Sequence, residues 1–364
     1  MKKIFIAATQ QNDGKTTLAL GLIYNLKSRI KKIGFIKPIG QRYLEEGGFK
    51  VDEDSVLVEK LLKSCGVRCG LKDTSPVAVE RGFTENYIVA PQRKAIEQQI
   101  KQAFGRVSKD RDAVIIEGTG HAGVGSVFDH SNARVARMLN SKVIIVSSGG
   151  IGRPIDEIVL NKALFEKERV AVAGVIINKV LPEKFDKVNR LIRKGLNRLG
   201  VEVLGVMPYN KVLSSFSMRQ VVEETDFKLL SGENFLDRRV DRILVGAMQA
   251  QDACKFFKDE MLIITPGDRE DILAAALDSC LENQKAIKIS GFILTGGFIP
   301  SNDIMKRLRN TEIPVLLSEK DTYSVASMVG DVTVKIRPED KEKIDIVEKM
   351  AKEFLDIDRI LERT

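Results

Sequence analysis

Short apolar runs alternate with helix-like segments through the first 210 residues of the chain. These runs are almost continuously apolar, which is typical of strands buried on both faces of a parallel sheet. Strands are expected at 2–8, 32–36, 112–117, 142–146, 170–178 and 202–206, and 84–91 is expected to be extended. Helices are expected at 18–26, 52–62, 92–104, 132–139, 154–165 and 185–199. The alternation predicts a doubly wound, mostly parallel α/β sheet with helices on both faces.

The alternation breaks near residues 211–217, and a second set of elements follows. Strands are expected at 240–246, 261–265, 287–294 and 314–317, and helices at 250–257, 271–280, 302–309 and 322–328. This set predicts a second, smaller α/β domain. The domains are expected at 1–213 and 214–335. A C-terminal segment, 336–364, is expected to contain a charged helix at 341–362 that packs on its own domain or on a partner.

The composition is typical of a globular protein. Hydrophobic residues make up 43% of the 364 positions, and 58 Lys and Arg residues against 50 Asp and Glu give a net charge of +8. Basic residues are spread among acidic ones and Trp is absent, so nucleic acid is not an expected partner. No apolar stretch suits a signal peptide or a membrane span, and a cytoplasmic location is expected. The cysteines are expected to be reduced thiols: Cys65, Cys69, Cys254 and Cys280.

The loop after the first strand is typical of a phosphate-binding loop. It ends in Gly14-Lys15-Thr16 and runs into a helix. N–H groups at a helix start favour an anion, glycine allows close backbone approach, and lysine adds charge for the outer phosphates. The usual pattern has glycine where Thr9 stands, so a plain strand-to-helix turn is the alternative. The expected nucleotide-binding residues are Asn12, Asp13, Gly14, Lys15, Thr16 and Thr17.

Several polar or flexible residues each follow one of the expected strands. They are Lys15, Lys37, Glu117, Gly149 and Asn178. Ligands of open parallel sheets lie at the carboxyl ends of the strands. These residues are therefore expected to meet at one edge of the sheet.

The chemistry of this edge suits a magnesium nucleotide. Thr16, Asp54 and Glu117 offer the oxygen ligands that Mg²⁺ prefers. Asp54 could instead be a helix N-cap, and Glu117 a surface acid at a strand end. Asn178 could pair with a purine edge or form a turn.

A small anionic molecule is the second expected ligand. Lys37 could neutralise its charge or that of a transferring phosphoryl group, and Arg42 could clamp a carboxylate. His121 is a candidate contact in a glycine-rich loop.

Together these residues resemble the dethiobiotin synthetase-like P-loop proteins, above all the version fused ahead of the catalytic domain in long phosphate acetyltransferases. The resemblance covers residues 1–210. It is carried by Gly14-Lys15-Thr16, Lys37-Pro38, Asp54, Ile116-Glu117-Gly118, Asn178 and Gly205-Val206-Met207-Pro208.

The resemblance implies a parallel sheet, often in a homodimer, that binds ATP (or GTP) with Mg²⁺. In dethiobiotin synthetase, ATP phosphorylates a carbamate. The implied catalytic residues are Lys15 and Lys37, with Mg²⁺ on Thr16, Asp54 and Glu117 and the nucleotide also near Asn178 and Pro208. The implied substrate contacts are Lys37, Gln41, Arg42, Glu117, Gly118 and His121.

Departures from the family pattern limit what is carried over. Ala8, Gln10 and Gln11 replace the usual glycine and threonines of the loop, and Gln10 lacks the second lysine of the partition-ATPase relatives. Gln41 and Arg42 stand where the synthetase has a substrate-contacting serine, which argues against diaminopelargonate as substrate.

Residues 216–329 resemble the DRTGG domain, which is regarded as regulatory or ligand-sensing. The resemblance rests on Asp268-Arg269 and Thr295-Gly296-Gly297, which are the expected ligand contacts of this domain. The Gly-Gly pair could accept a nucleotide phosphate or form a plain turn. No acetyltransferase catalytic domain is recognised, so acetyl transfer is not predicted.

Two functions therefore remain open. The chain could be a Mg-ATP-dependent enzyme that phosphorylates a small carboxylate-like substrate. It could also be a nucleotide-responsive regulatory module for a separate metabolic enzyme such as a phosphate acetyltransferase. A purely structural protein with a relict P-loop is the third possibility.

Overall fold

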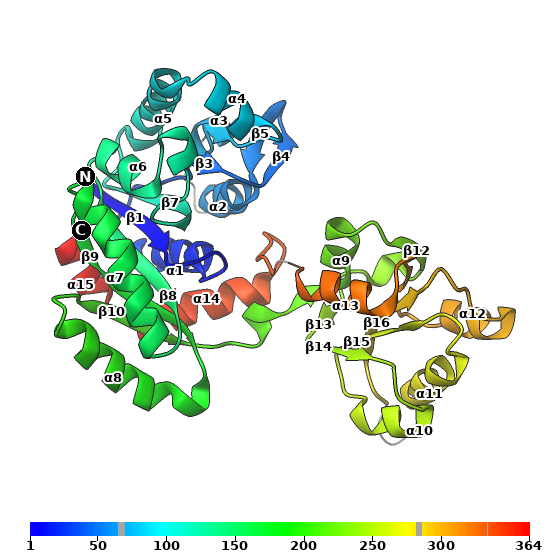
Figure 1. Cartoon of the computed structure of the whole chain (residues 1–364). Helices are drawn as coiled ribbons and strands as arrows, with labels where there is room; N and C mark the ends of the chain where they lie inside the picture. The colour runs from blue at the N-terminus through cyan, green and yellow to red at the C-terminus, as the bar shows by residue number, and fades with distance from the viewer. Residues whose placement is uncertain (65–69, 282–285, 333) are drawn as a thin grey trace. The chain divides into compact units, whose positions relative to one another are not determined.

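The computed structural model describes residues 1–64, 70–281, 286–332 and 334–364 (Figure 1). The chain divides into two compact units. Unit 1 comprises Met1–Tyr209 and Ile336–Thr364, and unit 2 comprises Asn210–Lys335. In the described part of the chain, every helix is too short or too polar to cross a membrane. Cys65 and Cys69 lie outside the described residues, and Cys254 and Cys280 are free thiols.

Unit 1 is built on a six-stranded, wholly parallel sheet in the order β10-β9-β8-β1-β7-β2. Its strands are β1 (Lys2–Ala8), β2 (Ile33–Ile36), β7 (Ala113–His121), β8 (Lys142–Ser148), β9 (Val172–Val180) and β10 (Val203–Pro208). These bounds confirm the six apolar runs expected from the sequence. Strand β7 continues to His121, so the first residues of the expected glycine-rich loop belong to the strand.

Helices cover both faces of this sheet, as the alternating pattern predicts. One face carries α5 (Arg93–Ser108), α6 (Asn132–Met138), α7 (Gly152–Lys167) and α8 (Phe185–Asn197). Ile100, Ala133, Ile158 and Ile192 of these helices join a single buried cluster with the strands. The opposite face carries α1 (Lys15–Leu26), which packs against β1 and β7.

The segment between β2 and α5 forms a small subdomain. It contains β3 (Ile39–Gly40), β4 (Tyr43–Glu46), β5 (Phe49–Asp52), α2 (Glu53–Ser64), α3 (Leu71–Thr74), β6 (Val77–Ala78) and α4 (Phe83–Val89). The expectation of an extended segment at 84–91 is wrong, because most of it is α4. The Tyr87 hydroxyl donates to Asp129 Oδ2 at 2.9 Å, and the Phe83 ring packs edge-on against Phe128. These tertiary contacts stabilise α4 over the extended conformation that the sequence predicts.

The C-terminal segment belongs to unit 1. The single helix expected at 341–362 is two helices, α14 (Lys341–Phe354) and α15 (Ile357–Arg363). They are separated at Leu355, which forms an antiparallel bridge to Gly205 in β10. Figure 1 shows α14 alongside α1. The strand-like contact of Leu355 with the sheet edge ends the first helix.

Unit 2 contains a five-stranded sheet in the order β12-β17-β16-β15-β14, with only β12 antiparallel to its neighbour. Its strands are β12 (Lys228–Ser231), β14 (Arg242–Val245), β15 (Met261–Pro266), β16 (Ile289–Thr295) and β17 (Val315–Leu317). Its helices are α9 (Met218–Glu224), α10 (Ala250–Ala253), α11 (Glu270–Leu281), α12 (Asn302–Arg309) and α13 (Thr322–Gly330). The run expected as one strand at 240–246 is divided, because β13 (Arg239–Val240) pairs instead with β11 (Phe216–Ser217).

A glycine allows α14 to approach α1 closely. A Cβ at Gly21 would lie 2.6 Å from the Cβ of Ala351. The Gly21→Val substitution is therefore expected to lower the free energy of unfolding by about 1–3 kcal/mol, because overpacking forces the helices apart. Urea denaturation measures this loss.

Gly105→Ala in α5 is the matched control, because an added Cβ there meets no described atom within 4 Å. That control is expected to gain about 0.5–1 kcal/mol from helix propensity. Equal stability of Gly21→Val and the unmodified chain would contradict the close packing.

Candidate functional site

The start of α1 has the geometry of an anion site. Gly14 precedes the helix in a left-handed conformation, with φ 100°, and within the described residues no side chain caps this end. The first N–H groups of a helix lack intrahelical acceptors and attract an anion. The Lys15 side chain lies at the same place and is almost buried. The Thr16 hydroxyl donates to Glu117 Oε1 at 2.9 Å.

Asp13 fixes the shape of the loop from inside. Its Oδ2 accepts from the Thr9 hydroxyl at 2.8 Å and from the Gln10 N–H at 2.7 Å. Its Oδ1 accepts from the hydroxyl of Ser148, at the end of β8, at 2.5 Å. The carboxylate is thus directed into the loop, and a contribution of Asp13 to nucleotide binding would come from its backbone.

Asn178 supports the loop from behind. Its Nδ2 donates to the Asp13 carbonyl at 2.9 Å, and its Oδ1 accepts from the Lys179 N–H at 2.9 Å. A Cβ at Gly14 would lie 2.2 Å from the same Nδ2. The amide is therefore engaged with the loop, and pairing with a base would require these contacts to be exchanged.

The carboxyl ends of the strands bring charged groups together beside α1. The Lys37 ammonium, which follows β2, pairs with Asp52 Oδ1 at 2.8 Å, with Glu117 Oε1 at 3.8 Å and with the carboxylate of Asp54. Lys37 and Glu117 are both buried. The predicted convergence on one edge of the sheet is thus observed for these side chains.

Burial and mutual charge shift the pKa values in this cluster. Burial lowers the pKa of Lys15, and nearby Glu117 opposes the shift. Burial and the carboxylate of Asp54 raise the pKa of Glu117 to about 8. Burial also lowers the pKa of Lys37, but the carboxylates of Asp54, Asp52 and Glu117 outweigh it, so that pKa lies above its ordinary value. Burial raises the pKa of Asp52, although Lys37 opposes the shift.

The expected substrate contacts fall into an exposed and a buried group. Gln41 and Arg42 are exposed at the start of the small subdomain. Gly118 is buried, and a Cβ there would lie 2.7 Å from Asn132 Oδ1. His121 is exposed at the end of β7, and its carbonyl accepts from Asn132 Nδ2 at 2.7 Å. Asn132 therefore fixes the strand end that carries Glu117 and His121.

Comparisons with known proteins identify the family of the chain. A family model described as an AAA domain matches residues 2–217, more than half of the chain. The chain belongs to this family. A second model, the DRTGG domain, matches residues 220–332. The predicted combination of a dethiobiotin synthetase-like P-loop domain and a DRTGG domain is thereby confirmed.

Curated relatives named phosphate acetyltransferase match nearly the whole chain. The protein from Pseudomonas aeruginosa is 27% identical over 380 residues, which cover 100% of this chain and 52% of that protein. The protein from Nitratidesulfovibrio vulgaris is 25% identical over 362 residues, which cover 97% of this chain and 50% of that protein. The chain thus spans about half the length of the curated relatives it matches.

Solved structures match parts of the chain at low identity. The MinC:MinD cell division protein complex of Aquifex aeolicus matches 59% of this chain and 84% of that one, with 17% identity and a TM-score of 0.38. The CBS and DRTGG domains of Clostridium perfringens pyrophosphatase, complexed with the activator diadenosine tetraphosphate, match 37% of this chain and 60% of that one. The identity there is 20% and the TM-score 0.27.

The signature residues of the DRTGG domain form hydrogen bonds with neighbouring loops. Arg269 donates to Asp271 and, at 2.7 Å, to the Met248 carbonyl. The Gly296 and Gly297 N–H groups donate to the carbonyls of Lys320 and Ser318. Both amides are therefore committed to backbone contacts, and the expectation that they accept a phosphate gains no support.

The other two expected ligand contacts of this domain lie at the same ends of the strands. The hydroxyl groups of Thr295 and Thr322 lie 2.7 Å apart, and Asp268 is exposed just after β15. The carboxylate of Asp321 caps α13 by accepting from the Tyr323 and Ser324 N–H groups. The Asp321 carboxylate thus occupies the N-terminus of α13, which could otherwise attract an anion.

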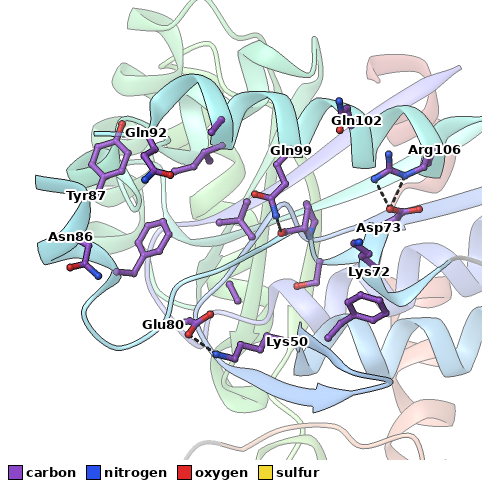
Figure 2. A pocket seen from close by; sticks show the side chains of 18 of the residues that line it. Lys50, Lys72, Asp73, Glu80, Asn86, Tyr87, Gln92, Gln99, Gln102 and Arg106 are labelled. Carbon is purple, nitrogen blue, oxygen red and sulfur yellow. Dashed lines mark hydrogen bonds and ion pairs between the residues drawn. The ribbon is translucent and has the colours of Figure 1, made fainter. Parts of the chain in front are cut away.

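A separate hollow of about 920 Å³ lies between α5 and the small subdomain. Figure 2 shows two ion pairs among its lining residues, Lys50 with Glu80 and Arg106 with Asp73. Its wall includes Ser75 and none of the loop at 9–17. The hollow is therefore distinct from the loop that precedes α1.

Two contributors to the site were not identified from the sequence. The sequence predicts Asp52 to be part of a helix start, but it ends β5 and pairs with Lys37. The sequence predicts Asn132 only as the first residue of a helix, but its side chain holds the end of β7. Asp52 stands two residues before Asp54, and this spacing of acids at a strand end was the available signal. Pro208, an expected nucleotide contact, is the last residue of β10 and so lies at the carboxyl ends of the strands.

Proposed function

We propose that unit 1 binds a nucleoside triphosphate, ATP rather than GTP, with Mg²⁺ at the start of α1. The proposal rests on one observation: at an uncapped helix N-terminus, Lys15 is nearly buried and Thr16 hydrogen-bonds to Glu117. The amides of this helix end and the Lys15 ammonium would hold the phosphates.

The residues that would hold the ion fit Mg²⁺. Glu117 Oε2 is buried and has no hydrogen-bond partner within the described residues, so it can accept a cation. Thr16, Asp54 and Glu117 supply only oxygen ligands, which suits a hard ion that keeps several waters. Across the described residues, no group of three or more His, Cys, Asp or Glu side chains is arranged to hold a metal. The ion would therefore depend on the phosphates for its remaining ligands and would offset their charge.

We further propose that nucleotide binding serves regulation, with phosphoryl transfer to a small carboxylate-like molecule as the second candidate. Regulation is favoured because the Lys37 ammonium is already paired with carboxylates, which leaves it poorly available to an anionic co-substrate. Transfer is favoured by the position of Lys37 beside Glu117, where a transferring group would pass. A separate enzyme such as a phosphate acetyltransferase is the proposed target, and a homodimer is the proposed assembly.

Calorimetry with ATP, GTP and ADP, each with Mg²⁺ or with EDTA, tests the proposal. Micromolar or tighter binding that requires Mg²⁺, without ADP release, supports the regulatory module. Release of ADP on addition of a small carboxylic acid supports the enzyme. If no nucleotide binds, both functions are excluded.

A further inference from the structure

The buried ammonium of Lys37 has more carboxylate partners than its charge requires. Asp52, Asp54 and Glu117 all face it, and its side chain is 8% exposed. In the proposed function, Asp54 and Glu117 bind Mg²⁺ and no longer neutralise Lys37. Asp52 then remains as the counter-charge of Lys37, and a buried cation without a counter-charge is strongly disfavoured.

Asp52 is held in place by contacts from several directions. Its N–H donates to the Ser75 hydroxyl at 2.9 Å, and its Oδ1 accepts from the Asp54 N–H at 3.0 Å. Gly40 leaves room for it, since a Cβ there would lie 2.6 Å from the Cβ of Asp52. Its Oδ2 is buried and has no hydrogen-bond partner in the part of the chain that the structure describes. The carboxylate is thus fixed beside Lys37 by its surroundings.

We infer that Asp52 is a built-in counter-anion for Lys37 and takes the place that a small anionic co-substrate would otherwise occupy. The inference rests on the proposed binding of a magnesium nucleotide. Its consequence is that the unmodified chain binds the nucleotide without any added anion. Removing the carboxylate leaves a space of about its own size next to a buried ammonium, which a free carboxylate can fill.

The test compares two substitutions of Asp52 in the full chain. Asp52→Ala opens the space, whereas Asp52→Asn fills it with a neutral group of the same shape. Affinity for Mg-ADP is measured by calorimetry in sodium formate and in sodium chloride of equal ionic strength. ADP is chosen because it lacks the γ-phosphate, which could itself neutralise Lys37.

Both variants are expected to bind Mg-ADP about tenfold more weakly than the unmodified chain in chloride, because the uncompensated ammonium repels Mg²⁺. Formate is expected to restore the affinity of Asp52→Ala only. Adding Lys37→Met to Asp52→Ala is expected to remove the formate effect, since the ammonium is then gone.

Two outcomes separate this inference from the proposed function. If the unmodified chain binds Mg-ADP but Asp52→Ala responds equally to formate and chloride, the inference is wrong and the proposed function stands. If the unmodified chain binds no nucleotide, the inference about Asp52 and the proposed function are both wrong. Should Asp52→Ala fail to fold, unchanged Mg-ADP affinity of Asp52→Asn would overturn the inference by itself.

Discussion

The Lys15→Ala substitution is expected to weaken Mg-ATP binding about a hundredfold, the largest loss expected from any single substitution in unit 1. The Lys15 ammonium is nearly buried and lies at the helix start that would hold the phosphates. Charge-assisted hydrogen bonds in such a site are stronger than those at the surface, because water screens them less. Calorimetry with Mg-ATP measures the loss directly.

Lys31→Ala is the matched control, because Lys31 is an exposed lysine beyond the end of α1. It removes the same charge from the chain and is expected to leave the affinity unchanged. Circular dichroism shows whether both variants are folded. A folded Lys15→Ala variant with unaltered affinity would place the phosphates elsewhere.

The arrangement of this site could be predicted because it follows from the topology. A parallel sheet brings the carboxyl ends of its strands to one edge, whatever the details of the loops. Lys15 and Lys37 each come after a strand and Glu117 lies within β7, so predicting that they meet required only that the apolar runs be identified correctly. The bounds of the six strands agree closely with those runs.

What could not be predicted depends on contacts between distant segments. Helix α4 forms where an extended chain was expected, because Tyr87 and Phe83 find partners some forty residues later along the chain. The break between α14 and α15 is set by the bridge from Leu355 to Gly205. The pairing of Asp52 with Lys37 likewise joins the end of β5 to the residue that follows β2. Local propensity contains none of this information.

The Glu117→Gln substitution is expected to remove most of the effect of Mg²⁺ on nucleotide binding. The amide retains the shape of the side chain and an acceptor for the Thr16 hydroxyl, but it lacks the negative charge that attracts the cation. Loss of a charged oxygen ligand is expected to lower Mg²⁺ affinity at least about tenfold. Comparing ATP affinity in Mg²⁺ and in EDTA measures the effect, and Glu45→Gln, at an exposed position of β4, is the control.

The pH dependence separates a metal ligand from a residue that only shapes the site. Burial and Asp54 raise the pKa of Glu117 to about 8, so in the metal-free protein this carboxyl group keeps its proton to a higher pH than an exposed glutamate does. Because Mg²⁺ requires the ionised form, its binding must displace that proton. Mg²⁺ affinity of the unmodified chain should therefore rise more steeply, as the pH increases towards about 8, than that of Glu117→Gln. Parallel profiles for the two proteins would show that Glu117 does not bind the ion.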